Sequence, residues 1–168
     1  MDFRFEIMTE VSINKQARLS EHFTLAEMCK TSAKTQDGNI PSHVHIENLK
    51  RLCGWLEMLR SEWNKRYGEG DDPIVINSGY RSEAVNKAVG GVKGSNHLTG
   101  CAADIRVAGI EQLVRYATIL LDISDESQED FDELLLERSP RGGYWLHFAV
   151  RPPSQENRRK VSLIQSLR

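Results

Sequence analysis

The chain has 168 residues, of which 39% are apolar and 27% are charged, with a formal net charge of −2. This length and composition fit one globular domain with a real core, and the near-neutral charge excludes a global basic field that would attract nucleic acid. No apolar run is long enough to span a membrane, so we expect no stable membrane insertion. We also expect a monomer with no nucleic-acid partner.

The N-terminal region is polar, with weak alternation of apolar residues. We expect an N-terminal arm over residues 1–20 and one domain over residues 21–168. The first residues include early acidic side chains and lack the apolar stretch of a signal peptide, which favours synthesis in the cytoplasm.

The first half of the chain predicts two helices. Thr24 and Glu27 form a capping-box pattern for a short helix. Ser42 can cap a long helix that ends near Gly68, because apolar residues recur there every three or four positions. These residues are Ile46, Leu49, Cys53, Leu56, Leu59 and Trp63.

The second half alternates between strands and helices. We expect a strand over residues 74–76, a brief helix over 82–89, a strand over 102–107 and a second long helix over 110–121. An acidic loop should follow over 125–130.

The last part of the chain predicts a hairpin and a helix. Two apolar-rich segments, 131–137 and 144–150, flank a turn that contains proline and two glycines. Residues 154–167 are expected to form a last helix. Because helices and strands are interspersed without strict βαβ repetition, we predict an α+β fold with a small central antiparallel sheet flanked by helices.

A short block of the chain combines a histidine with an acidic residue. His97 and Asp104 are seven residues apart, and Gly100 allows a sharp bend between them. Asp104 lies on the predicted strand, with its side chain on one face. A histidine from the incoming turn and an aspartate on the strand could therefore converge on one point.

A second histidine, His147, lies in a strongly apolar strand, where a buried imidazole needs a partner that a metal would supply. Two histidines and one carboxylate leave a fourth position open, which is typical of a catalytic zinc site. Zinc held in this way can lower the pKa of a bound water molecule and polarise a carbonyl. The alternative is a hydrogen-bonded core histidine, which is commoner for a lone histidine in a strand.

Several blocks together are similar to one known family. They are Ser95-x-His97-x2-Gly100-x-Ala102-x-Asp104, the later Trp145-x-His147, and Ser78-Gly79-Tyr80-Arg81-Ser82 with Asn86. They resemble the zinc peptidase family of D,D-carboxypeptidases, D,D-dipeptidases and phage L-alanyl-D-glutamate endolysins. The N-terminal pattern Phe23-Thr24-x2-Glu27 with Asn39-x-Pro41 resembles its small phage- and prophage-associated branch. The likeness covers about residues 20 to 150 and implies a D-Ala-D-Ala-peptidase-like fold, whose metal arrangement also occurs in hedgehog-type domains.

The resemblance implies a metal and its ligands. Three residues match the family's zinc ligands: His97, Asp104 and His147. Zn²⁺ is therefore the expected cofactor.

Two further roles follow from the resemblance. Arg81 matches an arginine that stabilises the developing oxyanion, and Ser95 matches a serine that orients the substrate. The alternatives are a surface salt bridge for Arg81 and a turn-capping hydroxyl for Ser95. Trp145 shares the strand face of His147 and should line the substrate pocket, unless it is plain core.

Hydrolysis by water also needs a general base. In several relatives this carboxylate lies three residues before the last histidine, where the present chain has Tyr144. Glu137 could reach the metal across the hairpin, and the small-branch relatives carry a glutamate near this point. We therefore expect Glu137 to be the base and Glu133 to be the second choice. The alternative is that Glu137 is a solvated charge at the strand end.

These patterns favour a zinc metallopeptidase, either a carboxypeptidase or an endopeptidase, that hydrolyses peptidoglycan stem peptides with metal-activated water. Cytoplasmic synthesis with action at the cell wall would fit a phage or prophage lysin. One alternative is a non-catalytic, zinc-stabilised module that binds cell-wall peptide. Another is a structural partner in a phage particle.

Overall fold

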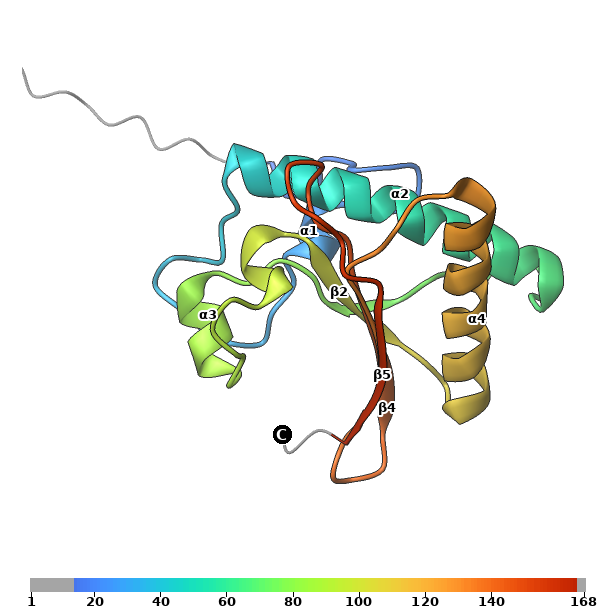
Figure 1. Ribbon diagram of the computed structural model, residues 1–168. Helices are drawn as coiled ribbons and strands as arrows, with labels where there is room; N and C mark the ends of the chain where they lie inside the picture. The colour runs from blue at the N-terminus through green and yellow to red at the C-terminus, as the bar shows by residue number, and fades with distance from the viewer. Residues whose placement is uncertain (1–13, 166–168) are drawn as a thin grey trace, which may run out of the picture.

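The computed structural model describes residues 14–165 and shows one sheet with two long helices packed against it (Figure 1). The helices are α1 (Leu25–Met28), α2 (His43–Arg66), α3 (Glu83–Ala88) and α4 (Ile110–Ser127), with a 3-10 turn η1 (Asn96–Thr99). The strands are β1 (Ile76–Ser78), β2 (Ala102–Arg106), β3 (Glu133–Arg138), β4 (Tyr144–Ala149) and β5 (Lys160–Gln165). They lie in the order β1-β2-β4-β3-β5.

The predicted α+β class with a central sheet and flanking helices is confirmed. β1 pairs with β2, β2 with β4 and β4 with β3, all antiparallel. The expected hairpin is β3 and β4, which are paired from Glu133 opposite Ala149 to Arg138 opposite Tyr144. The sheet is mixed rather than wholly antiparallel, because β5 runs parallel to β3.

The predicted last helix over residues 154–167 is wrong for the part that the structure describes. Residues 160–165 form β5, whose backbone pairs with the edge of β3. A six-residue segment with apolar residues two and three apart is compatible with either period, and the open edge of β3 decides in favour of a strand. Residues 166 and 167 lie outside the described part of the chain.

The other expected elements are present, with shifted ends. The caps on α1 and α2 are those predicted, since Thr24 accepts a hydrogen bond from the Glu27 N–H and Ser42 accepts one from the His45 N–H. The first strand begins at Ile76, two residues later than the start predicted for it. The helix predicted over 110–121 continues to Ser127, into the expected acidic loop.

The sheet has one face for the core and one face that is free for a site. The core face carries fully buried apolar side chains: Ala103, Ile105, Leu134, Leu146 and Phe148. Helices α2 and α4 cover this face, and the Trp55 ring of α2 lies 5.4 Å from the Phe148 ring. Helix α3 and turn η1 lie on the other side of the sheet (Figure 1).

The N-terminal region is described only from residue 14. Backbone hydrogen bonds join this stretch to α1, including Leu25 N–H to the Ala17 carbonyl and Ala26 N–H to the Lys15 carbonyl. Residues 1–13 of the expected arm lie outside the described residues, and the arm stays a prediction. In the part of the chain that is described, no helix has the length and apolarity to cross a membrane.

One buried asparagine joins the loop before α2 to the segment that follows β1. The Asn39 side chain donates to the Cys29 and Tyr80 carbonyls and accepts from the Ser82 N–H, at 2.9, 3.1 and 2.7 Å. Its backbone is left-handed, with φ of 52°. Because unpaired buried polar groups are costly, this side chain holds the segment around Arg81 in place.

We predict that Asn39→Ala lowers the free energy of unfolding by about 2–4 kcal/mol, because three backbone groups lose a buried partner. Denaturant unfolding of chelator-treated protein would measure the loss. Lys34→Ala, in the same loop but exposed, should change the unfolding free energy by less than about 0.5 kcal/mol. Equal values for the two variants would contradict this prediction.

Candidate metal centre

Two of the expected metal ligands lie opposite each other in the sheet. Asp104 of β2 is directly paired with His147 of β4. Paired residues on antiparallel strands project from the same face, so both side chains leave the sheet on the face that the core does not use. Asp104 Oδ1 lies 2.9 Å from His147 Nδ1.

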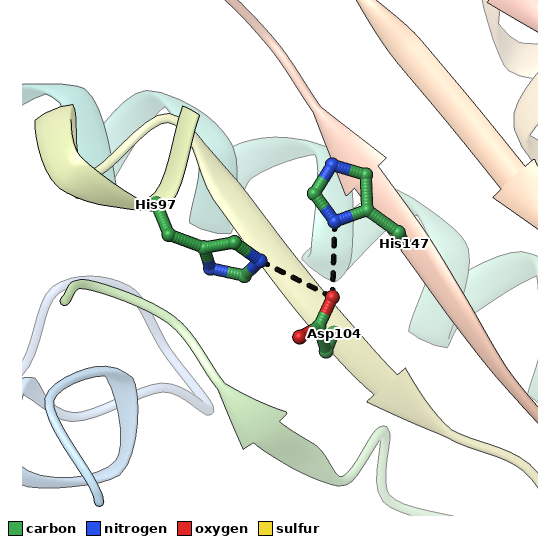
Figure 2. A group of neighbouring side chains, drawn as sticks. All are labelled: His97, Asp104 and His147. Atoms are coloured by element: carbon green, nitrogen blue, oxygen red, sulfur yellow. Dashed lines mark hydrogen bonds and ion pairs between the residues drawn. The ribbon is translucent and has the colours of Figure 1, made fainter. Parts of the chain in front are cut away.

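The third expected ligand, His97, reaches the same point from η1. Its Nε2 lies 3.2 Å from the same Asp104 oxygen, so the two imidazoles converge on one carboxylate oxygen (Figure 2). Gly100 ends the turn with φ of 73°, and a Cβ there would lie 2.6 Å from the His45 carbonyl oxygen. A glycine is therefore required for the chain to turn from η1 into β2.

A backbone carbonyl fixes the protonation of His97. Its Nδ1 lies 2.6 Å from the Gly79 oxygen, which can only accept, so Nδ1 carries the proton. In the neutral ring, Nε2 then presents a lone pair to the Asp104 oxygen. Two acceptors that face each other at 3.2 Å would be stabilised by a cation bound to both of them.

The three ligand atoms therefore fit a metal ion. One atom each from His97, Asp104 and His147 lies within 4.8 Å of the others. Zinc with bonds of about 2 Å holds its ligand atoms no more than about 4 Å apart, and the two measured contacts to Asp104 already lie in that range. Two neutral imidazoles and one carboxylate suit zinc and leave a position open for water or substrate.

His147 has a second partner on its far side. Its Nε2 lies 3.2 Å from Glu133 Oε2, while Nδ1 faces Asp104. A carboxylate that accepts the second ring N–H of a metal-binding histidine fixes the orientation of the ring and makes it a better ligand. Glu133, the second choice for the base, is thus the glutamate that contacts a metal ligand.

The acid–base properties of the cluster also favour a bound cation. Burial disfavours the charged ring of His147, but its hydrogen bonds with Asp104 and Glu133 outweigh this and raise its pKa to about 9. The hydrogen bond to His147 lowers the pKa of Glu133 to about 2, despite partial burial. Burial would raise the pKa of Asp104, but its interactions with His97 and His147 outweigh this and hold the pKa well below its usual range. Both carboxyl groups are therefore ionised, and they favour a positive charge on the groups that lie between them.

Arg81 binds the outer side of the same carboxylate. Its Nη2 lies 2.5 Å from Asp104 Oδ2, and its Nε donates to Ser78 Oγ at 2.8 Å. The side chains of Arg81 and Asp104 are 12% and 14% exposed, so this ion pair is not the surface salt bridge considered as the alternative. Arg81 also lines the pocket, and its contact with the oxyanion stays a prediction.

The cluster lies in a pocket of about 730 Å³, which is also lined by the other expected site residues. They are Arg81, Ser95, Glu137 and Trp145. Ser95 accepts a hydrogen bond from the His97 N–H at 3.3 Å, so it caps the turn in this structure. Leu135 is paired with His147, and Glu137 is paired with Trp145 two residues further along. Tyr144 projects from the other face and offers the pocket no group.

Sequence reasoning missed two polar residues that line the pocket, Asn96 and Arg158. Asn96 donates to the carboxylates of both Asp132 and Glu133, at 2.7 and 3.1 Å. Arg158 forms ion pairs with the same two carboxylates. The assignment of residues 154–167 to a helix hid these contacts, because Arg158 lies two residues before the start of β5, which pairs with β3.

The chain is similar to known proteins over much of its length. A family model described as peptidase M15 matches residues 21–122, which include His97 and Asp104 but not His147. The zinc D-Ala-D-Ala carboxypeptidase of Streptomyces albus G is 31% identical over 84 residues, which cover 50% of this chain and 31% of the relative. The aligned region thus spans less than a third of that relative's length.

We predict that metal-free protein binds one Zn²⁺ and is stabilised by about 2.7 kcal/mol when free zinc is a hundred times the dissociation constant. His147→Ala should lose this binding, whereas His43→Ala, at the exposed start of α2, should keep it. Calorimetric titration and thermal unfolding would measure both effects. Retention of tight zinc binding by His147→Ala would contradict the assignment.

We also predict that Glu133→Gln weakens zinc binding about 10- to 100-fold, because the ring of His147 loses its charged partner. Competition with a chelator of known affinity would measure the change. Glu69→Gln is the matched control, because Glu69 is exposed and does not line the pocket. Equal zinc affinity in the wild type and Glu133→Gln would show that the contact does not support the ligand.

Proposed function

The chain belongs to the peptidase M15 family, and on that premise we propose that it is a zinc metallopeptidase that hydrolyses peptide bonds in bacterial cell-wall peptides. The observation that carries the proposal is the meeting of His97, Asp104 and His147 in an open pocket. A site with three protein ligands keeps room for water and substrate, whereas a structural zinc site usually closes its coordination with four. The relative from Streptomyces albus G supports the choice of zinc and of a peptide substrate.

The three ligands would hold the zinc ion, which when bound lowers the pKa of water and polarises the scissile carbonyl. Glu133 and the Gly79 carbonyl orient the two imidazoles, and Arg81 orients the carboxylate. Other residues of the pocket must transfer protons and stabilise the negative charge that develops on the substrate.

We assign proton transfer to Glu137. It lines the pocket from the strand next to His147. Glu133 is a poor base, because its pKa is lowered to about 2 and its Oε2 binds His147 and Asn96. In the proposed reaction Glu137 accepts a proton as the water oxygen bonds to the carbonyl carbon. It then gives that proton to the leaving amine as the C–N bond breaks.

Arg81 is proposed to stabilise the oxyanion. Its guanidinium is held by Asp104 and Ser78 and borders the same pocket. A planar group with five N–H donors can keep these contacts and still donate to a developing negative charge. Trp145, half-buried on the same strand face as His147, would supply an apolar wall for the peptide.

One observation favours the alternative of a zinc-stabilised module that binds cell-wall peptide without cleaving it. Strand β4 supplies no carboxylate to the pocket, because Tyr144 occupies the position of the relatives' base and projects away from it. The proposed proton transfer therefore rests on a carboxylate of β3, for which we propose Glu137. The bond that is cleaved, the monomeric state and the setting of a phage or prophage lysin stay predictions.

We predict that Glu137→Gln keeps zinc binding and lowers turnover by about 10²- to 10⁴-fold, because the proton acceptor is removed while its shape is kept. Mass spectrometry of muropeptides released from purified peptidoglycan would measure cleavage by the wild type and the variant. Chelation should abolish wild-type cleavage and zinc should restore it. Equal cleavage by Glu137→Gln would remove this residue from the role, and a zinc-loaded wild type that binds but never cleaves would favour the binding module.

A further inference from the structure

Two arginines at the edge of the pocket are held by one buried carboxylate. The Asp132 side chain is 0% exposed. Arg158 donates to its two oxygens through Nε and Nη2, at 2.8 and 2.7 Å. Arg151 Nε lies 3.0 Å from Asp132 Oδ1. Because Asp132 already holds both guanidinium groups in place, they can bind a ligand with little further loss of side-chain conformational entropy.

These arginines are close to the metal ligands. Glu133 Oε1 lies 2.9 Å from Arg158 Nη2, and its other oxygen lies 3.2 Å from Nε2 of His147. A single glutamate side chain therefore separates Arg158 from a metal ligand. Arg151, Arg158 and Lys160 all line the pocket that contains the metal centre.

Positive charge exceeds negative charge at this edge. Three cationic side chains meet two carboxylates there: Arg151, Arg158 and Lys160 face Asp132 and Glu133. The cationic side chains are 27%, 45% and 48% exposed. Within residues 14–165, Nη2 of Arg151 and Nη1 of Arg158 have no hydrogen-bond partner. The edge can therefore accept one more anionic group.

We propose that Arg151, Arg158 and Lys160 form a carboxylate-binding subsite that selects peptides with a free carboxylate close to the scissile bond. An extended peptide advances roughly 3.3–3.6 Å per residue, so with only Glu133 between Arg158 and His147 the carboxylate lies within one or two residues of that bond. Fixed arginines favour carboxylates because two parallel N–H groups match the two oxygens. This inference rests on the proposed function, since it places the peptide at the same metal centre.

A peptide can present such a carboxylate in two ways. Its own C-terminus would make the protein a carboxypeptidase that releases one or two residues. An acidic side chain next to the scissile bond would suit an endopeptidase equally well. The chemistry of the subsite is the same in both cases, and amidation of one carboxylate at a time separates them.

The test uses the zinc-loaded 168-residue chain and three forms of one short peptide that ends in D-Ala-D-Ala and carries one acidic side chain. The first form has both carboxylates free, the second has a C-terminal amide, and the third has the side chain amidated. We expect one amidated form to lose roughly 10- to 100-fold in kcat/KM, mainly through KM, because a charge-assisted contact made in the bound peptide is removed. Calorimetric titration with each form gives the binding preference separately.

Two substitutions test the residues. Arg151→Gln and Lys160→Gln should each shrink the preference for the free carboxylate, and both leave Arg158 to pair with the buried Asp132. Matched changes outside the pocket, Arg115→Gln and Lys65→Gln, should leave the preference unchanged. Thermal unfolding of all four variants checks that they remain folded.

The outcomes separate this inference from the proposed function. Equal hydrolysis of all three forms would overturn the subsite while the peptidase activity stands. No hydrolysis, with binding that prefers the free carboxylate and weakens in Arg151→Gln, would support the subsite and overturn the activity. Equal binding without hydrolysis would overturn both. A preference that survives Arg151→Gln and Lys160→Gln unchanged would also overturn the subsite.

Discussion

The carboxylate of Asp104 is the group on which the centre depends. One oxygen faces the rings of His97 and His147, and the other binds Arg81. A carboxylate this deeply buried is costly unless its partners are in place. Folding must therefore bring a 3-10 turn, two paired strands and the segment after β1 to one point. The same contacts that make burial of the charge tolerable assemble the ligand set for a metal.

The pairing of the strands places Asp104 in the pocket while its neighbours on β2 are buried in the core. On β2, Ala103 and Ile105 face the helices while Asp104 faces the pocket, so one strand serves both the core and the site. A shift of the register by one residue would place Asp104 in the core and an apolar side chain in the pocket. The apolar face thus does more than stabilise the domain, because it sets the register that places Asp104 opposite His147. Stability and metal binding are linked through that register.

Part of the candidate ligand set was predictable from local rules. Spacing, a glycine bend and strand alternation indicated that His97 and Asp104 converge, and the family resemblance added His147, which long-range pairing of β2 with β4 places opposite Asp104. Alternation also placed Glu133 and Glu137 on the same face, but it could not say which one contacts His147. The pairing of the hairpin does not decide this either, because Leu135 is opposite His147 with one glutamate two residues to either side. Only the side-chain contact between His147 Nε2 and Glu133 Oε2 identifies Glu133 as the partner.

The rest could not be predicted, for physical reasons. The Gly79 carbonyl that orients His97 is a backbone group without a signal of its own. The contact of Arg158 with Asp132 depends on a parallel strand whose short pattern also fits a helix. Family resemblance supplied the expected metal, but it described neither contact. Long-range backbone pairing, rather than side-chain type, is the missing information in both cases.

The two histidines also differ in how easily a mutation can remove the group that orients each of them. His97 is oriented by a main-chain oxygen, which every residue possesses, although a side chain at position 79 would collide with the Met28 carbonyl. His147 is oriented by the side chain of Glu133, which a single nucleotide change can replace. The orientation of His97 therefore depends on the path of the backbone, whereas the orientation of His147 can be altered by substitution of one side chain. Over evolutionary time, metal affinity in this architecture can drift through one partner of His147 while the fold and the remaining ligands stay as they are.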